Sequence, residues 1–448
     1  MAAKLPARLL FSYGLGDAGT GLAATVQGFY LFPFFTEFAG LSAGLAGTVL
    51  MVLKVWDGFN DPLIGWLSDH THSRWGPRLP WIALGVIPLG LCFGAMWWVP
   101  PGGIHQRLLY YVVMAVAMMT AYTAVNLPYA ALSTELSPHT NVRTRLNAAR
   151  FSGSLLAGFI GLLLAFRFVS AGADGYLRLG LTGGLLVALT GLACAWGLSP
   201  YVSHSARPVH QPEGIRVQLL RIATNVRFRK VLMLYLLLWY ALQLMQTVSL
   251  VYLRVVLHLQ GSLALAMPML FQLSAVAGLW VWSNVSRRRG RVHALRWGVY
   301  LWGIALVLAL LLQPLDLADG PFAGPATSFA TITLLVTITL LGLGGSTAFL
   351  IPWSLLPDAI DADPDRPAGL YTAWMVLVQK VGIGFGIFFL GIVLEFSGYV
   401  ADLGLDQTPL ALTTIRLCIS VIPGVLIALG LIVMRRWPER AARAVEAA

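Results

Sequence analysis

Twelve long apolar stretches, separated by short segments rich in glycine, proline or charge, run through the 448 residues of this chain. They fall at 10–36, 43–68, 79–99, 107–132, 150–170, 179–198, 231–257, 262–284, 294–313, 327–350, 370–396 and 412–434. A helix needs roughly 20 apolar residues to cross the hydrocarbon core of a bilayer. The sequence therefore predicts an all-α membrane protein with twelve transmembrane helices and little room for a soluble domain.

The longest polar interval, at 200–230, divides these stretches six and six. This division is expected when two similar six-helix halves pack about an axis along the membrane normal. The predicted organisation is an N-terminal half at 1–199, a cytoplasmic middle loop at 200–230 and a C-terminal half at 231–448.

The charged residues are few, at 11% of the chain, and unbalanced, with 30 Lys and Arg against 19 Asp and Glu. In a soluble domain a net charge of +11 would suggest a nucleic-acid partner. Here most basic residues fall in alternate loops, on the side that also holds both termini and the middle loop. The positive-inside rule makes that side cytoplasmic. We therefore expect a multi-pass protein of the plasma or inner membrane, touching membrane lipid and binding no nucleic acid.

Six ionisable residues lie deep inside the apolar stretches, where a charge costs several kcal/mol unless it is paired or faces a polar cavity. They are Asp17, Lys54, Asp57, Asp61, Arg150 and Lys380. Such residues usually mark the path of a solute or an ion.

The second stretch places Asp57 and Asp61 one helical turn apart, with Lys54 three residues before and Asn60 beside the pair. Two close carboxylates repel each other, and a proton, Lys54 or a bound hard cation would relieve the repulsion. A salt bridge that only locks helices together is the structural alternative, but Lys54 alone cannot neutralise both acids. The pattern favours a site for a coupling cation.

Catalytic patterns do not stand out. The glycine-rich runs at 14–16 and 382–386 lie inside apolar stretches rather than between a strand and a helix, so they do not indicate a dinucleotide site. The expectation is a protein that is not an enzyme and that has no cofactor and no metal beyond a coupling ion.

Four segments together carry a family resemblance: Tyr13–Asp17, Trp56–Pro62, Ser73–Trp81 and Asn126–Tyr129. They resemble the glycoside-pentoside-hexuronide:cation symporters, the melibiose-carrier branch of the major facilitator superfamily. The resemblance covers essentially the whole chain. It implies a two-half transporter that works by alternating access and couples Na⁺ or H⁺ flow to solute uptake.

The resemblance also implies roles for individual residues. Asp57, Asn60, Asp61 and Thr123 match the cation site, and Lys54 matches a neighbouring basic residue that the family has as Arg. The residues that it places at the substrate site are Asp17, Gly21, Asn126, Arg150, Trp374 and Lys380, with Lys380 linking the two halves by charge. Asp69, Arg74 and Arg78 resemble the cytoplasmic gate motif of the superfamily.

Two positions depart from the melibiose carrier, in which two acids hold the sugar hydroxyls. Gly21 and Asn126 stand at the aligned positions here. Asp17, one turn before Gly21, could supply a displaced acceptor, and Asn126 can still donate and accept hydrogen bonds.

A second branch fits as well. The segment 351–358 with Asp361, the run NLPYAAL at 126–132 and the segment 396–399 resemble the animal Na⁺-dependent lysophosphatidylcholine symporters. A glycine at position 21 would suit their apolar cargo. The acids Asp358, Asp361, Asp363 and Asp365 are interpreted as a solvated cytoplasmic loop or an interdomain latch, not as a metal site.

The leading hypothesis is thus a monomeric, cation-coupled symporter of a glycoside or related small solute. Na⁺ is favoured over H⁺ because a proton site needs only one acid. A lysophospholipid symporter is the alternative, and a receptor or scaffold that transports nothing is a third possibility.

Overall fold

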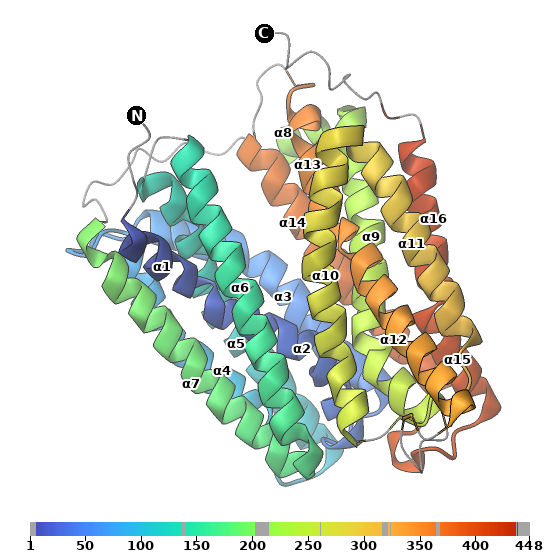
Figure 1. Cartoon of the computed structure of the whole chain (residues 1–448). Coiled ribbons are helices and arrows are strands. Elements are labelled where there is room, and N and C mark those ends of the chain that lie inside the picture. The colour runs from blue at the N-terminus through green and yellow to red at the C-terminus, as the bar shows by residue number, and fades with distance from the viewer. Residues whose placement is uncertain are drawn as a thin grey trace. The chain divides into compact units, whose positions relative to one another are not determined.

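The computed structural model of the chain describes residues 6–136, 140–201, 215–259, 261–315, 321–322, 324–363, 368–435 and 437 (Figure 1). All regular elements in these ranges are helical. The chain forms two compact units, Met1–Gln211 and Pro212–Ala448, here called unit 1 and unit 2.

Unit 1 contains seven α-helices and two short 3₁₀ turns. They are α1 (Ala7–Gly16), α2 (Ala18–Glu37), α3 (Ala43–Asp69), α4 (Leu79–Met96), α5 (Ile104–Leu136), α6 (Thr140–Phe168), η1 (Val169–Ala171), α7 (Gly172–Leu198) and η2 (Ser199–Tyr201). Helix α4 packs against α5 and α7, α2 packs against α6, and α3 lies along α5. Helix α1 contacts both α6 and α7.

Unit 2 contains nine α-helices, a π-helical turn and a 3₁₀ turn. They are α8 (Ile215–Thr224), α9 (Val226–Val251), η3 (Tyr252–Val256), α10 (Gly261–Arg289), α11 (Arg291–Leu311), α12 (Pro325–Gly345), α13 (Thr347–Ile360), α14 (Ala368–Phe396), η4 (Ala401–Leu403), α15 (Pro409–Ile419) and α16 (Val421–Met434). Helix α9 contacts α13, α14 and α16, while α12 packs on α10 and α11.

Each predicted apolar stretch coincides with one helix or with two consecutive helices. Nine helical segments of the described ranges are long and apolar enough to cross a membrane. The all-α membrane fold is therefore confirmed, whereas the number of twelve crossings remains a prediction. Helix α3 is not among the nine segments; its middle carries Lys54, Asp57 and Asp61.

Three of the stretches expected as single helices are interrupted. The breaks fall at Asp17 between α1 and α2, at Ser346 between α12 and α13, and at Ser420 between α15 and α16. Local chemistry accounts for the last one, because Pro423 has no N–H to donate to the carbonyl of Ile419 four residues earlier. At Ser346, two preceding glycines lower the helix propensity.

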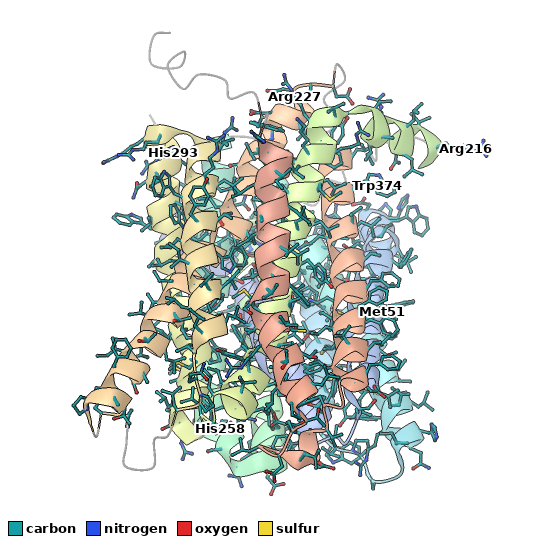
Figure 2. The ribbon with its side chains drawn as sticks, turned by 90° about the vertical axis from the view of Figure 1, so that its right-hand side faces the viewer. Met51, Arg216, Arg227, His258, His293 and Trp374 are labelled. Atoms are coloured by element: carbon teal, nitrogen blue, oxygen red, sulfur yellow. The ribbon has the colours of Figure 1, made fainter. Side chains whose placement is uncertain are left out.

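The interval 200–230, expected as a loop, contains α8 and the first turn of α9; residues 202–214 lie outside the described ranges. The indole nitrogen of Trp374 donates to Oε1 of Gln218 at 3.1 Å, and Arg221 forms an ion pair with Asp363 at 3.2 Å. Both contacts tie α8 to the rest of unit 2. Figure 2 shows Arg216, Arg227 and Trp374 towards one end of this unit and His258 near the other.

Candidate functional site

Asp17 occupies the break between α1 and α2. It is only 6% exposed, and it is both the C-cap of α1 and the N-cap of α2. Its carboxylate accepts a 2.8 Å hydrogen bond from the hydroxyl of Thr20, three residues along. A break inside a predicted membrane span is typical of transporter binding sites.

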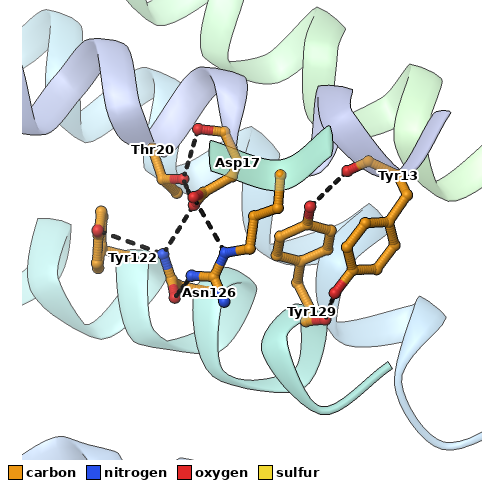
Figure 3. Close-up of polar contacts among 7 residues, drawn as sticks. Tyr13, Asp17, Thr20, Tyr122, Asn126 and Tyr129 are labelled. Carbon is orange, nitrogen blue, oxygen red and sulfur yellow. Dashed lines mark hydrogen bonds and ion pairs between the residues drawn. The ribbon is translucent and has the colours of Figure 1, made fainter. Parts of the chain in front are cut away.

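Arg150 of α6 and Asn126 of α5 complete the surroundings of this carboxylate (Figure 3). Nε of Arg150 donates to Oδ2 of Asp17 at 3.0 Å, and Nδ2 of Asn126 donates to Oδ1 at 3.4 Å. Arg150 also donates from Nη2 to the side-chain oxygen of Asn126 at 3.3 Å. Three helices thus meet at one mostly buried ion pair.

Two tyrosines extend this cluster and were not anticipated from the sequence. The hydroxyl of Tyr122 accepts a 3.3 Å hydrogen bond from Asn126. The ring of Tyr129 lies under the Arg150 guanidinium, 5.4 Å from its centroid, and stacks on Tyr13 at 4.8 Å. A polar side chain one helical turn from a predicted site residue is the signal that could have indicated Tyr122.

Tyr13 and Tyr129 hold α1 against α5 by reciprocal hydrogen bonds and ring stacking. The hydroxyl of Tyr129 donates to the backbone carbonyl oxygen of Tyr13. In return, the hydroxyl of Tyr13 donates to the backbone carbonyl oxygen of Tyr129 at 3.5 Å. A Cβ on Gly16 would overlap the Tyr129 ring. The glycine of the YGLGD segment therefore allows the aromatic ring to pack directly on the α1 backbone, next to the helix break.

The second group of predicted residues lies on α3 and α5. Asp57 is 6% exposed, and its Oδ1 accepts a 3.2 Å hydrogen bond from the hydroxyl of Thr123. Asn60 is 3% exposed, and within the described ranges its amide nitrogen has no hydrogen-bond partner. Lys54 and Asp61 are partly exposed on the same helix. Within this group, the contact between Thr123 and Asp57 joins α5 to α3.

Helix α5 connects the two groups. Its Thr123 contacts Asp57, and its Asn126, three residues later, contacts Asp17. Three residues before Thr123 on α5, the hydroxyl of Thr120 accepts a 2.9 Å hydrogen bond from the indole of Trp56 on α3. A change at either acid therefore acts on the same stretch of one helix.

Gly21 does not face an open site. It is buried where α2 approaches α6, and a Cβ there would lie 2.7 Å from both the Cα and the carbonyl oxygen of Ser154. Close packing of two helices thus requires a glycine at this position. The structure thus gives Gly21 a packing role, and its place at the substrate site stays a prediction. Asp17, one turn earlier, brings the carboxylate to Arg150.

Only two of the three predicted gate residues come together in unit 1. Arg78 donates to Asp69 and, at 2.6 Å, to the hydroxyl of Ser68. The guanidinium of Arg74 instead lies over the ring of Trp75, 5.4 Å from its centroid. The short loop after α3 is thereby held against the start of α4.

Trp374 and Lys380 both lie on α14 of unit 2, six residues apart and partly exposed. Trp374 donates to Gln218 of α8, as described above. Beside Lys380, the Oε1 atom of Gln379 accepts a 3.0 Å hydrogen bond from Tyr235 of α9. Tyr235 in turn contacts the ring of Trp353 edge-on at 5.8 Å.

The predicted acidic run also belongs to unit 2. Asp358 pairs with Arg291 at 2.6 Å, and Asp363 pairs with Arg221 and accepts a 2.7 Å hydrogen bond from Tyr371. Asp365 lies outside the described residues. Two of these acids thus bind arginines of their own unit.

Comparison with known proteins agrees with this architecture. The family model described as MFS/sugar transport protein matches residues 12–439. A crystal structure of a mutant nucleoside transporter NupG aligns with a TM-score of 0.69 over 95% of this chain and 98% of that chain, at 15% identity. The fold is therefore that of the major facilitator transporters.

Three relatives span nearly the whole chain. An uncharacterised symporter of Synechocystis sp. is 31% identical over 98% of this chain and 95% of its own length. A putative glycoside/cation symporter of Escherichia coli, YagG, is 26% identical over 94% and 89%. The sodium-dependent lysophosphatidylcholine symporter 1-A of Danio rerio is 22% identical over 95% and 84%.

The fold and the buried polar clusters define a membrane transporter rather than an enzyme. The chain belongs to the MFS/sugar transport protein family, whose matched members here are named as symporters.

Proposed function

We propose that this protein couples the inward movement of Na⁺ to the uptake of an uncharged, glycoside-like solute. The cation is assigned to Asp57, Asn60, Asp61 and Thr123, and the solute to the cluster around Asp17, Asn126 and Arg150. The observation that carries the proposal is the pair of hydrogen bonds that join both acids to α5, from Thr123 to Asp57 and from Asn126 to Asp17.

The substrate cluster suits a neutral, hydroxyl-rich molecule. Arg150 and Asp17 already neutralise each other at 3.0 Å, so the site has no net charge to attract an ion. What it offers is a set of donors and acceptors from a guanidinium, an amide and the hydroxyls of Thr20 and Tyr122. Sugar hydroxyls, which both donate and accept, match such a set.

The cation cluster suits a metal ion better than a proton. A proton would neutralise one carboxylate, whereas the second acid, the Thr123 hydroxyl and the Asn60 amide provide further oxygens of the kind that hard cations bind. A half-turn of the Asn60 amide exchanges its nitrogen and oxygen. The oxygen would then occupy a buried position that lacks a partner among the described residues, and a cation would satisfy it.

Binding of the cation would also act on α5. Neutralising Asp57 changes the partner of Thr123, and Asn126 on the next turn holds Asp17 and Arg150 in place. We infer that the cation binds first and prepares the substrate cluster. Lys54 would adjust the charge of the cation site, and the roles that the resemblance implies for Lys380 and Trp374 stay predictions.

A lysophospholipid symporter is the second candidate, because a relative bears that name. The glycine at position 21 does not favour it, since helix packing against Ser154 explains that glycine. The buried carboxylate at Asp17 favours a polar solute instead. We place the protein in the plasma or inner membrane as a monomer, with both termini cytoplasmic.

The test is uptake by the full chain in lipid vesicles, with a panel of radiolabelled glycosides and lysophosphatidylcholine, under an inward Na⁺ gradient or an inward pH gradient. The expected result is glycoside accumulation that requires Na⁺. Dependence on the pH gradient alone would reassign the cluster to protons, and uptake of only the lysolipid would reverse the order of the two candidates. If no gradient drives any solute, the protein is a receptor or scaffold.

Asp57→Cys is expected to abolish accumulation while leaving the protein in the membrane. The matched control is Asp174→Cys, which removes an exposed acid from the first turn of α7. Normal accumulation by Asp57→Cys would refute the cation assignment.

A further inference from the structure

The turn between α10 and α11 carries an unusual density of positive charge. The two helices are joined by Gly290 alone, in the left-handed region at φ 96°, so the end of α10 lies directly beside the start of α11. Arginine occupies positions 287, 288, 289, 291 and 296. His293, on the first turn of α11, lies at the same end of unit 2 as Arg227 (Figure 2).

Among the described residues, one of these arginines pairs with a carboxylate. Arg291 pairs with Asp358 at 2.6 Å and donates to the carbonyl oxygen of Ser354, also at 2.6 Å. Arg287 contacts the uncharged amide oxygen of Asn284. In the described part of the chain, no carboxylate pairs with the other arginines, and Arg287, Arg288, Arg289 and Arg296 are all exposed.

The start of α11 adds to the positive potential. Gly290 provides no side-chain cap, and the first turn contains no acidic residue. The first N–H groups of a helix lack carbonyl partners within the helix and carry the positive end of its dipole. Together with the exposed arginines, they form a place where a phosphate group would be favoured.

The exposed face of α11 indicates where the basic turn would lie relative to a bilayer. Trp297, Tyr300, Ile304, Val307 and Leu311 repeat every three or four residues and are each more than half exposed. This spacing puts them on one face of α11. The face begins with two aromatic residues and continues as aliphatic ones, as expected for a helix that passes from headgroups into hydrocarbon.

Helix α16, which packs beside α11, has a similar face. Its exposed apolar residues Ile422, Val425, Leu429 and Ile432 also follow a spacing of three or four. The two helices thus offer a continuous apolar surface next to the basic turn. A molecule that has a phosphate at one end and acyl chains at the other matches this combination.

We propose that the α10–α11 turn is a binding site for an anionic phospholipid. Its phosphate is held by Arg288, Arg289, Arg296 and the start of α11, and its acyl chains lie on the exposed face of α11 below Trp297 and Tyr300. The site consists of residues of unit 2 alone and does not depend on which solute is transported. Arginines that serve only to orient the chain in the membrane would attract anionic lipid without a defined site.

The test uses the purified full chain in dodecyl maltoside micelles, to which dioleoylphosphatidylglycerol or dioleoylphosphatidylcholine is added. The lipid bound is counted by native mass spectrometry, and the thermal midpoint is followed in parallel. Saturable binding is expected for phosphatidylglycerol at a lower mole fraction than for phosphatidylcholine. Equal binding of the two lipids, or a full thermal shift from glycerol phosphate alone, would overturn the proposal.

Variants locate the site. Arg289→Gln with Arg296→Gln is expected to raise the half-saturating mole fraction of phosphatidylglycerol about 25-fold, because each arginine near an anionic surface contributes about fivefold. The lysine pair, Arg289→Lys with Arg296→Lys, keeps the charge and should stay within about threefold. Arg216→Gln with Arg229→Gln removes two exposed charges from α8 and α9 and should change little. An unchanged glutamine pair, or an equal loss in the α8–α9 control, would refute a site at this turn.

Discussion

Thr123 and Asn126 lie three residues apart on α5, and each donates a hydrogen bond to a different buried carboxylate. The distances are 3.2 Å to Oδ1 of Asp57 and 3.4 Å to Oδ1 of Asp17. One acid belongs to the proposed cation cluster and the other to the proposed substrate cluster. A single turn of one helix is therefore the physical connection through which the occupancy of one cluster can influence the other.

The hydroxyl of Thr123 is the first point to test. Thr123→Val keeps the shape of the side chain but removes the hydroxyl whose oxygen is a proposed ligand of the cation. A polar contact to a charged group contributes about 1.5–3 kcal/mol. We expect the Na⁺ concentration for half-maximal uptake to rise about tenfold or more. Thr123→Ser keeps the hydroxyl and should remain near the parent value. Equal Na⁺ dependence in the valine variant would remove Thr123 from the site.

The Arg150–Asp17 pair makes a prediction about stability. Removing one partner of a buried ion pair leaves an uncompensated charge and costs about 3 kcal/mol. Arg150→Gln and Asp17→Asn should each lower the thermal midpoint of the purified protein. The double variant, which leaves no charge, should be less destabilised than the sum of the two single variants. Strict additivity would mean that the two groups do not interact in the protein.

Gly21 and Gly303 offer a matched pair of glycines. A Cβ on Gly21 would lie 2.7 Å from the Ser154 backbone, whereas a Cβ on Gly303 meets nothing within 4 Å. Gly21→Ala should therefore cost about 1–3 kcal/mol through overpacking and reduce the yield of folded protein. Gly303→Ala should be tolerated, because alanine favours a helix over glycine. Measured unfolding midpoints of the two variants in detergent would decide whether helix packing explains Gly21.

The anchoring of α8 can be followed by hydrogen exchange. Asp363 forms an ion pair with Arg221 and accepts a hydrogen bond from the hydroxyl of Tyr371. The side-chain amide of Asn225 donates to the same hydroxyl at 3.1 Å. Arg221→Gln should speed amide exchange in α8 about tenfold or more, because one charge-assisted contact is lost. Arg216→Gln, which removes an exposed charge from the same helix, should not. Similar exchange rates in the two variants would show that the ion pair does not hold α8.

Much of this architecture is predictable from the sequence because membrane spans are long and uniformly apolar. The same property explains why Asp57, Asp61, Asp17 and Arg150 could be singled out: charges are rare there and costly. The partners of these residues on other helices could not be predicted in the same way. Nothing in the local pattern indicates that Arg150 meets Asp17, since 133 residues separate them.

The differences between expectation and structure have local physical causes. The close approach of Ser154 to Gly21 comes from another helix and is invisible in a linear pattern. The sequence predicts a loop where α8 lies, because a basic segment of ten residues is too short to span a membrane. At the break between α1 and α2, the Asp17 carboxylate bonds to Thr20 and to Arg150 of α6 at once.

The proposed function requires that the cluster at Asp57 and the cluster at Asp17 are coupled through α5. The most direct measurement is equilibrium binding of the transported glycoside to the purified protein with and without saturating Na⁺, together with Na⁺ binding with and without the glycoside. Coupling through α5 predicts that each ligand raises the affinity for the other by the same factor, which is typically about 5–150-fold for coupled sites. A glycoside affinity that is identical with and without Na⁺ would contradict it.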